Sequence, residues 1–111
     1  MATISNLVVD QGTTFSSIIT ITNQDGTPMD LTDYTVKSQF RKSYQSSTAI
    51  NFTASIYDAG AGEVRLQLAP ADTTGVRAGR YLYDIELTSP SNEKIRALEG
   101  LVILTPEITK T

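Results

Sequence analysis

Apolar and polar residues alternate in short runs along this chain, which is the pattern of half-buried β-strands. The clearest run is RYLYDIELT, in which Tyr81, Tyr83 and Ile85 share one face while Asp84 and Glu86 lie on the other. A helical period never lasts more than about two turns. The predicted strands are the segments 3–9, 14–22, 43–57, 63–69, 80–88 and 94–105, with one more strand within residues 29–42. These seven strands predict an all-β fold, an antiparallel sandwich.

The residues between these runs are typical of turns. Asp25-Gly26 is a strong turn signal, because glycine accepts a positive φ and aspartate tolerates it. Pro70 suits a first helical turn, so we expect one short helical turn in PADTTG before the sixth strand. In the last strand the apolar positions shift parity after Ala97, and Gly100 beside that shift predicts a β-bulge.

Length and composition limit the kinds of site and partner that this chain can have. A chain of 111 residues predicts a single domain, residues 1–111. The sequence has no Cys, His or Trp, which removes disulfides, thiolate metal sites and the usual general base. The net charge of −3 argues against a nucleic acid partner. The sequence has neither a secretory signal nor an apolar run of about 20 residues, so we expect no membrane partner and synthesis in a cytoplasm.

Tyr81, Tyr83 and Asp84 have two interpretations. A phenol–carboxylate site would need a strongly perturbed tyrosine, because the pKa of tyrosine is ordinarily about 10. The nearest cation in sequence, Arg80, points to the opposite face. We therefore expect Tyr83 to fill the core and Asp84 to be solvated, paired across strands with Lys37 or Arg96.

Other candidate sites are weaker. Asp25, Asp30 and Asp33 cluster around one loop, where carboxylates and carbonyls could hold Ca²⁺, but the spacing is not that of an EF-hand. Acidic turns are common, so we expect no metal and no cofactor, with the calcium alternative left open. Tyr44 and Tyr57 are the outward aromatic residues on which a sugar could stack.

Residues 43–57 carry no charge, although edge strands usually carry charge or proline to prevent pairing with other chains. The segment is also rich in serine and threonine. We predict that it is a docking segment, with Ile50, Asn51, Phe52, Thr53 and Ser55 as its main residues. The alternative is a loop followed by an interior strand that its neighbours protect.

The stretch from PADTTGV to RYLYDI resembles the immunoglobulin-like sandwich. In that family a helical turn precedes the sixth strand, and a tyrosine hydroxyl then bonds upstream backbone, forming the tyrosine corner. Gly79 and Tyr81 match the corner, and Tyr83 stands where antibody domains carry their second disulfide cysteine. The resemblance implies structural roles for all three residues, in a domain outside the antibody branch.

The whole chain resembles small virion proteins of tailed phages, including the immunoglobulin-like N-terminal module of upper baseplate proteins. The matching stretches are SNLVVDQGTTFSSIITI, GTPMDLTDYTVKSQFRKSY, GEVRLQLAPADTTGVRAGRYLYDIEL and EKIRALEGLVILTPEIT. This resemblance implies a non-enzymatic structural subunit, present in multiple copies in the tail, baseplate, neck or capsid of the virion. Its partners would be other virion proteins and copies of itself.

Two other functions stay open. A carbohydrate- or receptor-binding adhesion module would stack sugars on exposed aromatic residues. An enzyme could use carboxylate pairs alone, as glycoside hydrolases do, although such folds are normally much larger.

Overall fold

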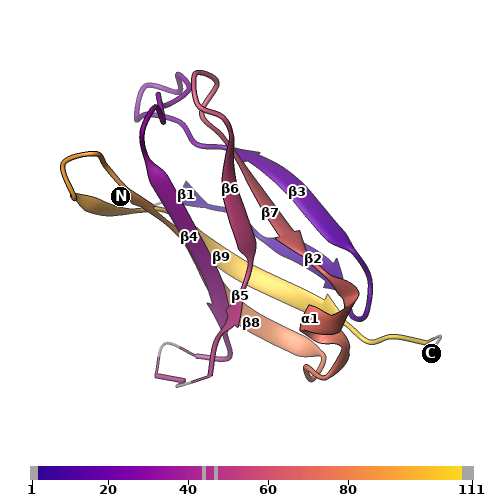
Figure 1. The fold of residues 1–111 in the computed structure, drawn as a ribbon. Coiled ribbons are helices and arrows are strands. Elements are labelled where there is room, and N and C mark those ends of the chain that lie inside the picture. Colours follow the sequence, from indigo (N-terminus) through magenta and orange to yellow (C-terminus); the bar gives the residue numbers. More distant parts are fainter. Residues whose placement is uncertain (1–2, 44, 47, 109–111) are drawn as a thin grey trace.

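The computed structural model describes residues 3–43, 45–46 and 48–108, which form two packed β-sheets (Figure 1). The elements found in these residues are β1 (Thr3–Ile4), β2 (Leu7–Asp10), β3 (Phe15–Thr20), β4 (Thr35–Arg41), β5 (Ile50–Asn51), β6 (Thr53–Asp58), β7 (Glu63–Leu68), α1 (Pro70–Thr74), β8 (Gly79–Thr88) and β9 (Lys94–Thr105). The predicted helical turn is confirmed as α1, which lies directly before the sixth of the predicted strands.

The strand order identifies the fold. The larger sheet has the order β1-β9-β8-β4-β5, with β2 also paired to β9, and the smaller sheet has the order β3-β7-β6. β1 and β2 run parallel to β9, and the other pairs are antiparallel. Strands β3, β7 and β6 take the places of strands B, E and D of an immunoglobulin domain, and β4, β8 and β9 those of C, F and G. The predicted all-β, immunoglobulin-like sandwich is confirmed.

The core lies between the two sheets and is built mainly from the inward positions of the strands, with Ile21, Leu31 and Phe52 added from the segments between strands. Its buried members are Val9, Ile21, Leu31, Phe40, Phe52, Val64, Leu66, Leu68, Tyr81, Tyr83, Ile85, Leu87, Leu98, Val102 and Leu104. Phe40 packs against both Phe52 and Tyr81, with ring centres 5.2 and 5.4 Å apart. Ser38 is also buried, and its hydroxyl donates to the carbonyl of Asp84 at 2.5 Å.

Two predicted strands are each divided. The first is interrupted at Ser5 and Asn6, between β1 and β2, where the backbone N–H of Leu101 donates to Asn6 Oδ1 at 3.0 Å. The segment 43–57 contributes β5 to the larger sheet and β6 to the smaller one. The chain crosses between the sheets at Phe52, whose N–H donates to the carbonyl of Ser38. Alternation of apolar residues cannot reveal such a crossing, because it continues unbroken through both strands.

The predicted β-bulge in the last strand is confirmed at the parity shift, but it does not involve Gly100. Ile85 pairs with Leu98 and Glu86 pairs with Arg96, so the extra residue is Ala97. Gly100 instead pairs in regular register with Tyr83. A Cβ at Gly100 would lie 1.8 Å from the carbonyl oxygen of Ser5, so glycine is needed here for the close approach of the N-terminal strand.

Candidate functional site

Tyr81 lies at the start of β8, where Gly79 has a φ of +146°, a region that favours glycine. The Tyr81 ring is buried, and its hydroxyl donates to the carbonyl of Arg77, four residues upstream. This is the hydrogen bond that a tyrosine corner makes. Lys42 lies over the same ring, with its Nζ 5.1 Å from the ring centre. These contacts hold the connection between α1 and β8 against the sandwich.

Tyr83 reaches across Gly100 to the N-terminal strand. Its ring is buried, and its hydroxyl donates to the carbonyl of Ser5 at 2.8 Å. Burial raises the pKa of Tyr83 to about 12, although the hydrogen bond to Ser5 works in the opposite direction. The phenol therefore stays protonated at neutral pH and acts as a donor that holds β1 in place. A phenol with this pKa is not deprotonated at neutral pH and so cannot accept a proton as a general base would.

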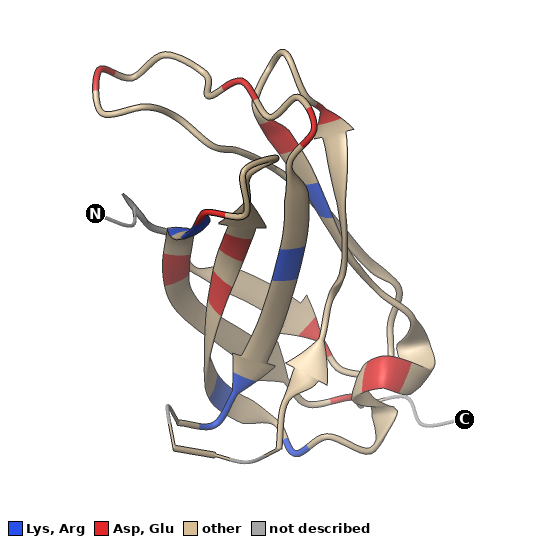
Figure 2. Ribbon diagram, turned by 60° about the vertical axis from the view of Figure 1, so that its left-hand side comes forward, with Lys and Arg blue, Asp and Glu red and all other residues tan. Residues whose placement is uncertain are grey.

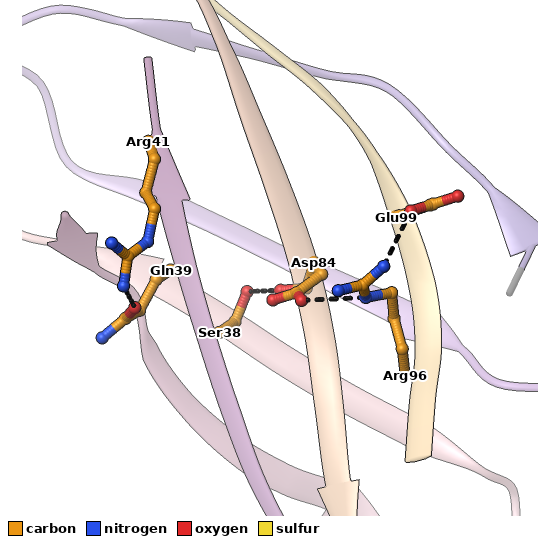
Figure 3. Close-up of polar contacts among 6 residues, drawn as sticks. All are labelled: Ser38, Gln39, Arg41, Asp84, Arg96 and Glu99. Atoms are coloured by element: carbon orange, nitrogen blue, oxygen red, sulfur yellow. Dashed lines mark hydrogen bonds and ion pairs between the residues drawn. The ribbon is translucent and has the colours of Figure 1, made fainter. Parts of the chain in front are cut away.

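Asp84 lies on the outer face of the larger sheet, in an ion-paired cluster (Figure 3). Of its two predicted partners, Arg96 is the one in contact: Arg96 Nε lies 3.2 Å from Asp84 Oδ2. Arg96 Nη1 also lies 3.5 Å from Glu99 Oε2. These residues line a shallow concavity of about 540 Å³, with Leu82 and Leu101 among its apolar members. The pairing with Arg96 engages the Asp84 carboxylate in a structural contact.

The acidic loop uses its carboxylates to close turns. Asp25 Oδ1 accepts hydrogen bonds from the N–H and the hydroxyl of Thr27, at 3.0 and 2.6 Å, and Asp30 does the same with Thr32. The threonine hydroxyls, and then the threonine N–H groups, lower the pKa of both carboxyls. Within the described ranges, no three acidic groups lie close enough together to hold a metal ion.

The predicted docking residues divide into two groups. Ile50 is half-buried against the core, and Phe52 is buried, with its ring centre 6.1 Å from that of Phe15. Asn51, Thr53 and Ser55 are exposed. The amide of Gln39 donates to Asn51 Oδ1 at 2.6 Å across the β4–β5 pair. Of the five predicted docking residues, those available to a partner are therefore Asn51 on the larger sheet and Thr53 and Ser55 on the smaller one.

β6 is one edge of the smaller sheet. It pairs with β7 on one side, and none of the described strands pairs with its other side. Residues 53–57 carry no charge, and Asp58 ends the strand. In Figure 2 the strand is accordingly tan, the colour of residues other than Lys, Arg, Asp and Glu, up to its end. The structure thus places the exposed part of the predicted docking segment on an open strand edge.

β3 is the opposite edge of the same sheet, and sequence reasoning did not identify it as a docking edge. Residues 11–24 also carry no charge, so the signal was present in the sequence. The sequence does not show which strands are neighbours. Only the strand order shows that β3 and β6, the strands of the two uncharged segments, are the two outer edges of one sheet.

Of the two candidate sugar-stacking residues, Tyr57 is 50% exposed, and the guanidinium of Arg65 lies over its ring at 4.7 Å. Tyr44 lies outside the described residues.

Among the residues that the structure describes, no helix is long and apolar enough to cross a membrane.

Comparisons with known proteins do not identify a family. No protein-family model matches the chain, and no curated protein matches it significantly. Among solved structures, an internalin-like protein of Listeria monocytogenes is similar over 96% of this chain and 28% of its own, with 12% identity and a TM-score of 0.46. A chain from work on the cell-adhesive interactions of VGSC beta subunits covers 96% of this chain and 93% of its own, with 12% identity and a TM-score of 0.44.

Proposed function

We propose that this chain is a non-enzymatic protein–protein interaction module that serves as a structural subunit of a tailed-phage virion, present there in multiple copies. The observation that carries the interaction role is the open, uncharged edge of β6. The virion role rests on the resemblance of the sequence to small phage structural proteins, and the position in the tail, baseplate, neck or capsid is left open.

The argument from β6 is one of unpaired backbone groups. A strand at the edge of a sheet presents a row of free N–H and C=O groups, and folded proteins usually protect such rows with charge or proline. Residues 53–57 have neither. The outward side chains of Thr53 and Ser55 are short and polar, so a partner strand can approach without a clash or a buried charge. Strand addition of this kind obtains its affinity from main-chain hydrogen bonds.

The non-enzymatic role is supported by the contacts of the candidate catalytic residues. Tyr81 and Tyr83 each donate their hydroxyl to a backbone carbonyl, and Asp84 is paired with Arg96. Each group thus has a structural partner within the fold.

The test is the double variant Thr53→Lys with Ser55→Lys, which places two charges on the β6 edge. Both positions are exposed, so the core tolerates the change and the melting temperature stays at the wild-type value. We expect the variant to fail to enter particles of the phage that encodes it, as measured by immunodetection on purified virions.

The matched control is Gln67→Lys. Gln67 pairs in register with Thr53 but lies on β7, the central strand, so it adds charge to the same face without changing an edge. This control should enter particles normally. Normal entry of the double variant as well would contradict docking through β6.

The adhesion alternative depends on Tyr57. Binding on a glycan array that is lost in Tyr57→Ala would favour that function over the proposed one.

A further inference from the structure

The second edge of the smaller sheet has the properties of a site for self-association. β3 pairs with β7 over six consecutive residues, from Phe15 to Thr20, without a bulge. Its other side has no strand partner among the described residues. Constant-type immunoglobulin domains place strand A in this sheet. Here both N-terminal strands, β1 and β2, lie on β9 in the larger sheet, which leaves β3 open.

The side chains of β3 are arranged symmetrically about Ile18. Ile18 is 44% exposed on the outward face, although it is a large apolar residue. Ser16 and Thr20 flank it on the same face, and both are exposed. An apolar centre between two small polar residues on an open edge is the arrangement that an identical strand, running in the opposite direction, would complement.

We propose that a second copy of this chain pairs with the first through antiparallel β3–β3 contact centred on Ile18. In this register Ile18 faces Ile18 of the other copy, and Ser16 faces Thr20. Outward residues meet outward residues, as antiparallel pairing requires. The two three-stranded sheets then become one continuous six-stranded sheet. The inference rests on the proposed function only in taking the chain to be present in many copies.

The charges near this edge do not oppose the binding of a second copy of the chain. Residues 11–24 bring no charge to the contact. The nearest charged side chains on the outward face lie one strand away on β7, where Arg65 pairs in register with Ile18 and Glu63 pairs with Thr20. Across the proposed dimer, the two Arg65 residues are three strand spacings apart, about 14 Å. That distance exceeds the Debye length of about 8 Å at physiological ionic strength, so their repulsion is screened.

The pairing also leaves β6 available. Because β3 and β6 are opposite edges of one sheet, a dimer through β3 still presents a β6 edge at each end. The six-residue ladder is smaller than a standard protein–protein interface, so we expect weak association of the isolated domain, strengthened by the high local concentration on a particle.

A cysteine cross-link tests the register directly, because the chain has no cysteine of its own. In Ile18→Cys the two new residues face each other, with Cβ atoms about 5 Å apart, close to the range that a disulfide spans. In the control Ser16→Cys, the two cysteines are four residues apart along the strands, about 14 Å. We expect mild oxidation to give a reducible covalent dimer with Ile18→Cys but not with Ser16→Cys.

The proposal is overturned if Ile18→Cys stays monomeric, or if Ser16→Cys forms the dimer equally fast. A second measurement, sedimentation of the purified protein over a range of concentrations, should show loss of the dimer in Ile18→Lys and retention in Gln67→Lys. These results are independent of the β6 test. A β3 dimer together with normal particle entry of the Thr53→Lys, Ser55→Lys variant would preserve this inference and refute docking through β6.

Discussion

Replacement of Gly100 by alanine tests how the N-terminal strand is held. An added Cβ would lie 1.8 Å from the carbonyl oxygen of Ser5 and 2.7 Å from its carbonyl carbon. The atoms it meets belong to backbone, which cannot rotate away as a flexible side chain can. The backbone at Ser5 must therefore shift away from β9, although β1 and β2, on either side of Ser5, are both paired in register with β9.

The size of the effect follows from the contacts at Ser5. Its N–H donates to the carbonyl of Glu99 at 2.9 Å, and its own carbonyl accepts from Tyr83 at 2.8 Å. Losing a hydrogen bond costs about 1 kcal/mol, and a buried hydroxyl without a partner costs about 1–3 kcal/mol. We therefore expect Gly100→Ala to lower the free energy of unfolding by about 3 kcal/mol, which corresponds to a melting temperature roughly 12 °C lower.

Thermal unfolding followed by circular dichroism measures this change. Gly75→Ala is the matched control, because Gly75 has a φ of −92° and an added Cβ there meets nothing within 4 Å. That variant should keep or slightly raise the wild-type stability. In a double-mutant cycle, Gly100→Ala and Tyr83→Phe should be less than additive, because both act on the contact with Ser5. A change in Gly100→Ala of less than about 0.5 kcal/mol would contradict the need for glycine at the contact with Ser5.

Three further predictions concern single side chains. Tyr81→Phe should lower the free energy of unfolding by about 1–2 kcal/mol, because the carbonyl of Arg77 loses its donor; chemical denaturation measures this, and no change would remove the corner role. Because the pKa of Tyr83 is raised to about 12, its stabilisation is complete below about pH 10 and falls as the pH rises from there to about 12. Tyr83→Phe should lack that loss in alkaline unfolding curves, and an equal loss in both proteins would contradict the assignment. Arg96→Gln should cost less than about 1 kcal/mol, since its ion pairs are half exposed, and a larger change measured by urea denaturation would contradict a surface role.

Much of the fold could be predicted from the sequence, because inward positions alternate with outward ones along most of the strands. Val64, Leu66 and Leu68 are buried, while Arg65 and Gln67 between them are more exposed, as the pattern predicts. The strand assignments follow from this local period, which does not depend on which strands are neighbours.

The features that could not be predicted depend on long-range contacts. Gly100 is close to Ser5 in space but far from it in sequence, so its role was assigned to a local bulge. Phe52 belongs to an alternating run that continues through a change of sheet. The open edge of β3 follows from the placement of β1 and β2 on β9, which no local pattern reveals.

The most direct test of the central claim, that this chain is a virion subunit that docks through β6, is a cryo-EM map of the phage particle at a resolution that shows strands. We expect density for this domain in several copies, with a strand of a neighbouring chain paired to residues 53–57 of β6. Absence of the domain from the particle, or a β6 edge that faces solvent in every copy, would contradict it.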